Sequence, residues 1–232
     1  MIDKMFKTPA STFDFSSLAK NYDRWYDTLV GKRYDREEKS AVLQFLPLAK
    51  PGDRLLEVGC GTGHWSRFFS SKGYEVVGVD ISPEMIEAAC LHNSPNCSFE
   101  IADVYRLPFD NASFEVVASM AMLEFVSKAE AAVEEMLRCT KPDGSVIIGT
   151  LNKLAPINRE RVVNNKEPYA SAHLFSPDEL RHLLASFGPV RIRVSVNESK
   201  HRQVKPLKDV WDKFALPWKQ STGAFIVAEV RP

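Results

Sequence analysis

Strand and helix patterns alternate in a regular order between residues 54 and 149. Five short apolar runs predict strands at 54–58, 74–79, 98–101, 114–119 and 145–149. Helix patterns lie between several of them, at 65–71, 82–92 and 128–139. The middle helix has a clear start, with Ser82 as N-cap and Pro83 at the first helical position. Because parallel strands are buried on both faces, this alternation predicts a parallel sheet covered by helices on two sides.

Further elements are predicted before and after this block. Two helices are expected before it, at 16–29 and 35–46. After the third helix we expect a turn at Lys141-Pro142-Asp143-Gly144, a capped helix from Ser176-Pro177-Asp178-Glu179, and strands at 190–196 and 224–230. Two segments, 152–175 and 197–222, are longer than ordinary loops, and connections of that length are usually functional or partly structured.

Composition narrows the class of protein. The chain has 232 residues, 44% of them hydrophobic, with 30 basic and 30 acidic side chains, which is typical of a globular protein. No apolar run approaches the ~20 residues that span a bilayer. The first residues lack the apolar stretch of a secretory signal. We therefore expect a cytoplasmic protein with no membrane span, as a monomer or homodimer.

Two classes of partner are disfavoured on the same grounds. The four cysteines lack the spacing of metal ligands, so no metal is expected. The formal net charge of zero argues against a dedicated nucleic-acid-binding protein. The charge is nevertheless uneven, because residues 151–220 hold 13 basic and 7 acidic side chains.

Glycines are concentrated in Glu57-Val58-Gly59-Cys60-Gly61-Thr62-Gly63, between a predicted strand and a predicted helix. They let the backbone turn tightly and approach a ligand, and the start of the helix offers unpaired N–H groups. A nucleotide-type ligand at the carboxyl ends of the strands is therefore expected. The glycine spacing does not fit the dinucleotide fingerprint G-x-G-x-x-G/A, and the G-x-x-x-x-G-K-[ST] phosphate loop is absent.

Three acids end successive predicted strands at intervals of 23 positions, namely Glu57, Asp80 and Asp103. The carboxyl ends of parallel strands meet at one edge of a sheet, so these carboxylates are expected to converge. An acid at the position of Asp80 can accept hydrogen bonds from ribose hydroxyls. Glu57 would repel a pyrophosphate and suits a positive group. The spacing thus favours a ligand that contains adenosine, lacks phosphate and carries a positive charge.

With Leu107-Pro108-Phe109 and Lys141-Pro142-Asp143-Gly144, these motifs resemble the class I S-adenosylmethionine-dependent methyltransferases. The similarity is to the small-molecule branch typified by ubiquinone/menaquinone-biosynthesis methyltransferases (methyltransferase type 11), and it is strong over 53–150. It implies a Rossmann-like, doubly wound α/β sheet of seven mostly parallel strands, the last antiparallel, with helices on both faces. It also implies an N-terminal helical cap over 1–50 and a cofactor domain over 51–232 with insertions at 152–175 and 197–222.

The resemblance implies S-adenosylmethionine as cofactor and S-adenosylhomocysteine as product. Glu57 and the glycine turn would line the methionine moiety, Asp80 would hold the ribose hydroxyls, and Asp103 would meet the adenine amino group. Tyr22 resembles an aromatic residue that closes over the cofactor. The implied cofactor-binding residues are Tyr22, Glu57, Gly59, Cys60, Gly61, Gly63, Asp80, Ile81, Met85, Ala102, Asp103, Val104, Ser119 and Met120.

The implied reaction is an in-line methyl transfer to a small-molecule acceptor, in which the enzyme mainly aligns the reactants. A general base is needed only if the acceptor holds its proton at neutral pH. The sequence does not decide a catalytic residue, and the candidates are Tyr22, Glu124 (where many relatives carry His) and His173. Acceptor specificity is expected in the irregular segments, where arginines could bind an anionic acceptor. The candidates in the first insertion are Asn152, Arg159, Arg161, Tyr169 and His173.

Three alternative functions stay open at this point. An RNA (tRNA) methyltransferase is suggested by the basic and aromatic segment 197–222. A non-catalytic regulator that binds S-adenosylmethionine would keep the same cofactor residues. An NAD(P)-dependent oxidoreductase on a similar sheet is disfavoured by Glu57 and by the glycine spacing.

Overall fold

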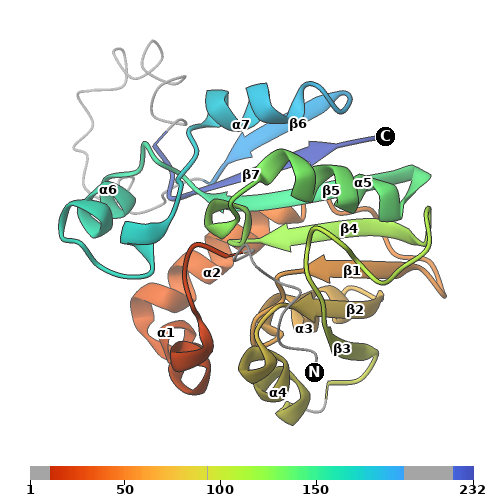
Figure 1. The fold of residues 1–232 in the computed structure, drawn as a ribbon, viewed down its shortest axis with the longest axis horizontal. Coiled ribbons are helices and arrows are strands. Elements are labelled where there is room, and N and C mark those ends of the chain that lie inside the picture. Colours follow the sequence, from red (N-terminus) through yellow and green to blue (C-terminus); the bar gives the residue numbers. More distant parts are fainter. Residues whose placement is uncertain (1–10, 93, 196–221) are drawn as a thin grey trace, which may run out of the picture.

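A seven-stranded sheet forms the middle of the molecule (Figure 1). The computed structural model describes residues 11–92, 94–195 and 222–232, and the architecture below refers to these. The strands run in the order β3-β2-β1-β4-β5-β7-β6. Their bounds are β1 Arg54–Val58, β2 Glu75–Asp80, β3 Cys97–Ile101, β4 Phe114–Met120, β5 Thr140–Leu151, β6 Val190–Val194 and β7 Phe225–Val230. Only β7 runs antiparallel to its neighbours, which confirms the predicted fold class.

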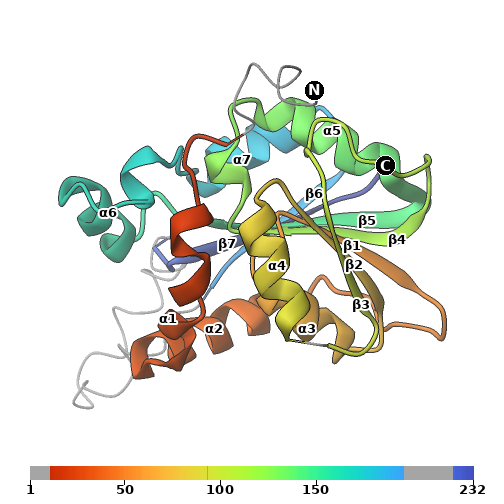
Figure 2. The same cartoon turned by 60° about the horizontal axis from the view of Figure 1, so that its bottom comes forward.

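Helices cover both faces of the sheet (Figure 2). One face carries α5 (Ala129–Cys139) and α7 (Pro177–Leu184), and the other carries α2 (Leu29–Val42), α3 (His64–Ser70) and α4 (Pro83–Leu91). Two hydrophobic clusters result. Val133 and Met136 of α5 belong to the first, and Trp65 and Phe69 of α3 belong to the second. The burial of both faces explains why the central strands are continuous apolar runs.

The start of the chain differs from the two predicted helices. A 3-10 helix η1 (Ser16–Asn21) and a single turn α1 (Arg24–Asp27) replace the helix expected at 16–29. The α2 helix then begins at Leu29 rather than 35, because Thr28 is extended and its Oγ1 accepts a hydrogen bond from the Gly31 N–H at 2.9 Å. A threonine N-cap of this kind ends one helix and starts the next.

The turn expected at 141–144 is instead a bulge within β5. Thr140 pairs with Phe114, and the next pair joins Ser145 to Val116, so four residues of β5 lie opposite the single residue Glu115. Lys141 in the bulge forms an ion pair with the Glu115 carboxylate. The strand therefore begins before the Pro-Asp-Gly sequence rather than after it.

The first long insertion contains two short helices and is attached to the sheet. Its elements are α6 (Pro156–Val163) and η3 (Tyr169–Ser171). The buried Asn152 donates from Nδ2 to the Gly223 carbonyl at 2.7 Å, and the buried Asn158 donates to the Ala224 carbonyl at 2.9 Å. These bonds hold the segment against the start of β7. The second insertion, apart from Thr222, lies outside the described residues.

The helix predicted after the first insertion is confirmed, together with its capping box. Ser176 Oγ accepts from the Glu179 N–H at 3.2 Å, and Glu179 Oε2 accepts from the Ser176 N–H at 2.7 Å. The backbone N–H groups of Ser176 and Glu179, which have no partner within the helix, thereby find acceptors.

Candidate active site

A cavity opens at the carboxyl ends of β1, β2 and β4, and residues 11–26, which are called the cap from here on, cover part of it. This strand-end cavity encloses about 890 Å³ of empty space, which includes solvent at its open mouth. Eleven of the implied cofactor residues line it: Tyr22, Glu57, Gly59, Cys60, Gly61, Asp80, Ile81, Met85, Ala102, Val104 and Met120. A ligand at the switch in strand order between β1 and β4 is the rule for sheets of this kind.

The glycine turn forms one wall of this cavity. Gly59 and Gly63 have φ angles of 75° and 76°, which side chains rarely adopt. A side chain at Gly59 would also collide with Met122, and one at Gly63 would meet the Phe99 ring. The N–H groups of Gly59 and Cys60 donate to the Val79 carbonyl at 2.8 and 2.9 Å, so β2 holds the turn in place.

Two carboxyl groups line the strand-end cavity. Glu57 is buried at the end of β1 and accepts a hydrogen bond from Ser66 Oγ. Burial raises the pKa of Glu57 to about 8, with a further contribution from the negative charge of Asp80. Asp80 accepts hydrogen bonds from the N–H groups of Gly61 and Ser82, both at 2.9 Å, and burial raises its pKa as well. A positively charged ligand would favour the ionised form of both groups.

Three implied cofactor residues, Gly63, Asp103 and Ser119, are not in the cavity lining. Asp103 Oδ1 accepts a hydrogen bond from the Tyr105 N–H at 2.9 Å, which forms a local turn, while Ala102 and Val104 on either side do line the cavity. The Oγ of Ser119 is buried in β4 and has no hydrogen-bond partner in the described part of the chain.

Asp23 attaches the N-terminal cap to the rim of the cavity. Its Oδ1 accepts a hydrogen bond from Thr62 Oγ1 at 2.5 Å, and its Oδ2 lies 3.3 Å from Arg67 Nη2 and 3.2 Å from His92 Nε2. These contacts join α1 to the glycine turn and to α4. They hold the neighbouring Tyr22 and Tyr26 in the cavity wall.

His64 lines the strand-end cavity, and sequence reasoning did not select it. Its Nε2 lies 2.7 Å from Asp35 Oδ1 and 3.0 Å from Lys39 Nζ, both on α2. The Tyr26 ring stacks on the imidazole with a centroid distance of 3.6 Å. The i,i+4 pair of Asp35 and Lys39 is visible in the sequence, but nothing there connects it to a histidine 29 positions from Asp35.

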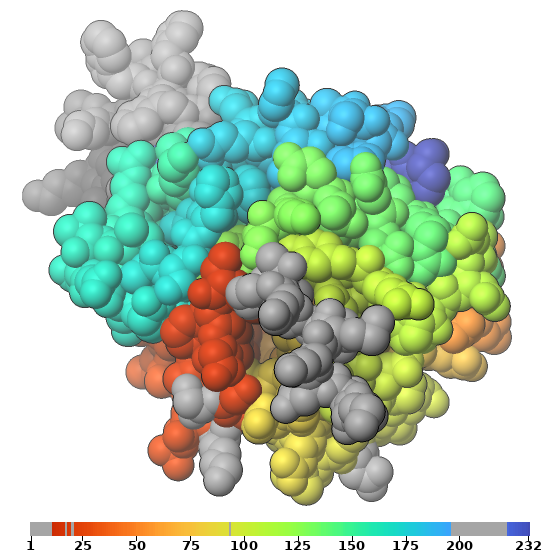
Figure 3. All heavy atoms as spheres, viewed as in Figure 1, coloured from red at the N-terminus to blue at the C-terminus, as the bar shows by residue number. Residues whose placement is uncertain are grey.

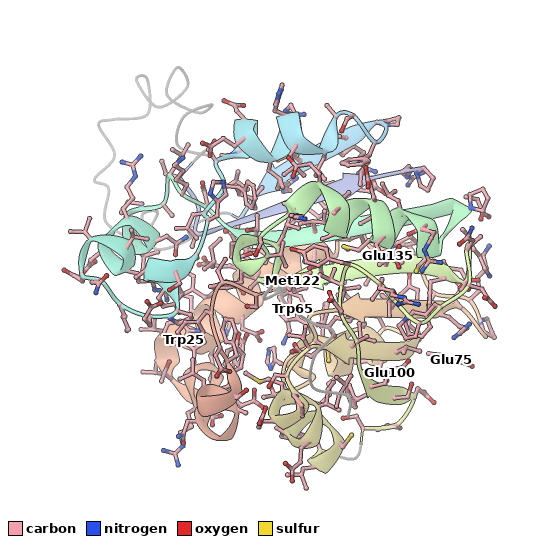
Figure 4. The ribbon with its side chains drawn as sticks, in the orientation of Figure 1. Trp25, Trp65, Glu75, Glu100, Met122 and Glu135 are labelled. Carbon is pink, nitrogen blue, oxygen red and sulfur yellow. The ribbon has the colours of Figure 1, made fainter. Side chains whose placement is uncertain are left out.

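A second cavity lies next to the first, between the cap, the first insertion and the ends of β5 and β7. This aromatic cavity encloses about 1140 Å³ including its mouth. The aromatic residues that line it are Phe15, Tyr22, Trp25, Tyr26, Tyr34, Trp65, Phe125, Tyr169 and Phe225. In Figure 3 the cap residues lie directly against the insertion, and Figure 4 places Trp65 near the centre of the molecule and Trp25 on the cap side.

The two cavities share a wall. The residues that line both are Phe15, Tyr22, Tyr26, Trp65, Ala121 and Phe125. None of them carries a carboxylate or an imidazole. Burial raises the pKa of Tyr22 and of Tyr26 well above the usual tyrosine range, so both hydroxyls keep their protons at neutral pH.

The three catalytic candidates lie in different surroundings. Tyr22 lines both cavities. Glu124, in the 3-10 helix η2 (Leu123–Phe125), lines neither; it is buried and accepts hydrogen bonds from Thr150 Oγ1 at 2.8 Å and the Leu151 N–H at 3.2 Å. His173 is exposed and lines neither cavity. Only Tyr22 is therefore placed to contact a ligand.

The candidate acceptor-binding residues of the first insertion also lie in different surroundings. Arg161 and Tyr169 line the aromatic cavity, whereas Asn152 is buried in contacts within the fold. Arg159 is exposed and donates from Nε to the Lys153 carbonyl at 3.3 Å. Glu38 of α2 also lines the aromatic cavity and was not selected from the sequence.

Among residues 11–92, 94–195 and 222–232, no group of three or more His, Cys, Asp or Glu side chains could hold a metal ion. Within the same ranges, no helix combines the length and the apolar character needed to cross a bilayer.

The central part of the chain matches a known family. Residues 56–148 match the family described as methyltransferase domain. Among solved structures, an S-adenosylmethionine-dependent methyltransferase from Thermotoga maritima, described as a possible histamine N-methyltransferase, superposes with a TM-score of 0.71 at 26% identity. That superposition covers 93% of this chain and 97% of the other. The match over residues 56–148 and the superposition both agree with the resemblance to the class I S-adenosylmethionine-dependent methyltransferases.

Curated relatives are similar over different lengths. A demethylmenaquinone methyltransferase from Beutenbergia cavernae is 37% identical over 134 residues, which are 58% of this chain and 55% of the relative. A ubiquinone biosynthesis O-methyltransferase from Paracidovorax citrulli is 29% identical over 214 residues, which are 86% of this chain and 87% of that relative. A malonyl-[acyl-carrier protein] O-methyltransferase from Serratia marcescens is 31% identical over 54% of this chain. The chain thus spans about half the length of the first and third relatives, at 55% and 48%.

Proposed function

We propose that the protein transfers the methyl group of S-adenosylmethionine to a small molecule by in-line displacement. The cofactor would bind in the strand-end cavity and the acceptor in the aromatic cavity. The observation that carries this proposal is the wall shared by the two cavities, formed by six residues that include Tyr22, Trp65 and Phe125. Ligands in the two cavities would meet there, as an in-line transfer requires.

The residues of the strand-end cavity fit the cofactor. When bound, S-adenosylmethionine supplies a methyl group on a positively charged sulfur. Glu57 is a buried carboxyl that accepts a hydrogen bond from Ser66, and it suits the charged methionine part. Asp80 ends β2, where it would accept hydrogen bonds from ribose hydroxyls. Ile81 and Met85 provide apolar surface for the adenine, and Asp103 stays a candidate for its amino group through Oδ2.

The shared wall bears on the chemistry of the acceptor. It holds no carboxylate or imidazole, and the raised pKa values of Tyr22 and Tyr26 make neither hydroxyl a base at neutral pH. We therefore propose that the acceptor enters with its nucleophilic atom already deprotonated, or loses its proton to water. Alignment between aromatic walls is then the main contribution of the protein, and orientation can lower a barrier by roughly 7–11 kcal/mol.

Thermal unfolding with three ligands tests the cofactor assignment. S-adenosylhomocysteine and S-adenosylmethionine are each expected to stabilise the protein by about 2.7 kcal/mol at 100 times the dissociation constant. NADH is expected to have no effect. A shift with NADH and none with either sulfur compound would overturn the proposal and favour an oxidoreductase.

A further inference from the structure

The aromatic cavity contains a guanidinium group that is held in place from several sides. The Cζ of Arg161 lies 5.4 Å from the ring centroid of Trp25 and 4.3 Å from that of Tyr169. Its Nη1 donates to Asn158 Oδ1 at 3.1 Å, and Asn158 is itself fixed by its bond to the Ala224 carbonyl. A planar guanidinium stacked on rings keeps its orientation, so its other N–H donors are preorganised.

Among the described residues, no carboxylate forms an ion pair with Arg161; its contacts there are the rings of Trp25 and Tyr169 and the amide oxygen of Asn158. Glu38 lines the same cavity and lies close enough for the Arg161 charge to favour its ionised form, but the two groups do not pair. Burial and the nearby charge of Asp35 outweigh that effect and raise the pKa of Glu38 to about 8. At neutral pH the carboxyl is therefore mostly protonated. Lys166 and Glu167 also line the cavity, so its described charges, with Arg161, sum to one positive charge.

The fixed guanidinium group suits an anionic ligand. A partly buried charge is costly to hold without a counter-charge, and arginine pairs with carboxylate or phosphate through two parallel hydrogen bonds. A protonated Glu38 can donate a further hydrogen bond to the same group. The remaining walls are largely aromatic, which suits a flat apolar body.

The position of Arg161 within the aromatic cavity indicates how a bound ligand would be oriented. Arg161 and Glu38 line the aromatic cavity but not the strand-end cavity, so neither belongs to the shared wall. Glu38 is the nearer of the two to that wall, since its charge helps to raise the pKa of Tyr26. A ligand whose anionic group meets Arg161 would extend between the rings toward Tyr22 and Trp65. Its other end would then face the cofactor.

We propose that the aromatic cavity selects small aromatic acids, whose carboxylate or phosphate binds Arg161 while a nucleophilic atom at the other end reaches the shared wall. The inference rests on the proposed function, since it takes the aromatic cavity as the acceptor site.

Calorimetric titration of the full chain saturated with S-adenosylhomocysteine tests this inference. The probes are 4-hydroxybenzoate, 4-hydroxyphenyl phosphate, the neutral 4-hydroxybenzamide and the cationic tyramine. At least one acid is expected to bind about ten-fold or more tighter than the amide, because charge-assisted hydrogen bonds are involved. The two acids show whether the cavity prefers a carboxylate or a phosphate.

Two arginines on the same helix provide matched variants. Arg161→Met is expected to weaken acid binding at least about ten-fold and to leave amide binding unchanged. Arg159→Met, which removes an exposed arginine outside both cavities, is expected to change neither. Arg161→Lys keeps the charge and loses the planar fork, so an intermediate loss is expected; it also replaces the methionine variant if that fails to fold.

The pH dependence of acid binding tests the contribution of Glu38. Acid binding is expected to weaken as pH rises through about 8, because an ionised Glu38 repels the anion. Glu38→Gln should bind acids at neutral pH and lose this pH dependence.

Three results would overturn the inference: no acid binds the wild-type protein, tyramine binds more tightly than both acids, or Arg159→Met and Arg161→Met weaken acid binding equally. A separate titration with S-adenosylhomocysteine alone distinguishes a failure of the proposed function from a failure of the inference about the acceptor. If that ligand does not bind, the proposed function itself fails; if it binds and the acids do not, only the inference about the acceptor fails.

Discussion

The strand-end cavity and the aromatic cavity share a wall, but they are built in different ways. The first is formed by the glycine turn and by the ends of neighbouring strands, so much of its shape is backbone. The second is formed mainly by side chains from the cap, α2, the first insertion and the start of β7. Backbone held by a sheet tolerates little change, whereas side chains on irregular segments can change one at a time. A common cofactor site and a variable acceptor site can thereby coexist in one fold.

Asp80→Ala gives the largest effect we expect on the strand-end cavity. The variant would lose the acceptor for ribose hydroxyls and also the bonds to the Gly61 and Ser82 N–H groups. With charge-assisted hydrogen bonds worth roughly 1.5–3 kcal/mol each, the affinity for S-adenosylhomocysteine should fall at least about 100-fold. Calorimetry measures this directly. An affinity within a few-fold of the wild type would mean that the ligand does not contact this rim.

A substitution at Glu124 tests whether this residue of η2 contributes only to the stability of the fold or also to the reaction. Glu124→Ala leaves Thr150 Oγ1 and the Leu151 N–H without their acceptor in the core, so the free energy of unfolding should fall by roughly 2–3 kcal/mol. Chemical denaturation measures the loss. A variant with wild-type stability and no methyl transfer would contradict the structural role and restore Glu124 as a catalytic candidate.

The pH dependence of stability provides a second test of Glu124. Burial raises its pKa to about 7 from an ordinary 4.5, so the folded state binds a proton more tightly than the unfolded state. Its contribution to stability is therefore complete below about pH 4.5 and is lost as pH rises through about 7. Glu124→Gln should remove this part of the pH dependence.

A smaller effect is expected for Glu57, as proton release on ligand binding. Because burial raises its pKa to about 8, Glu57 is mostly protonated in the free protein at pH 7. A cationic ligand favours the carboxylate, so binding of S-adenosylmethionine should release close to one proton. Affinity should then rise as pH increases toward 8. Calorimetry in buffers of different ionisation enthalpy measures the release, and equal release from Glu57→Gln would assign it to another group.

The smallest effect is expected outside both cavities. His173 is exposed, and its contact with Glu124 is made by its backbone N–H, which donates to the Glu124 carbonyl at 2.7 Å. His173→Ala should therefore leave the rate of methyl transfer and the free energy of unfolding within error of the wild type. A large loss of rate with normal stability would show that the imidazole takes part in the reaction.

Prediction from the sequence was most successful where a pattern is local. The strand that contains Glu57, the capping box at Ser176 and the acid at Asp80 each follow from residues within a few positions of one another. Prediction was poorer where local rules compete. Thr28 interrupts a continuous helix pattern by capping the next helix, and Asp103 uses Oδ1 in a turn with Tyr105 rather than in the cavity lining. These outcomes depend on which of several available hydrogen bonds the folded chain forms.

By itself the sequence determined the order of strands and helices, the glycine turn and the acids at the strand ends, because hydrophobic periodicity and capping are properties of neighbouring residues. The tertiary structure decided which distant side chains meet. It brought Glu38 and Arg161 into one cavity, placed His64 against Asp35, and left His173 at the surface. Such contacts depend on how the cap and the first insertion pack against the sheet. No spacing in the chain records that packing, and it is where the acceptor site is defined.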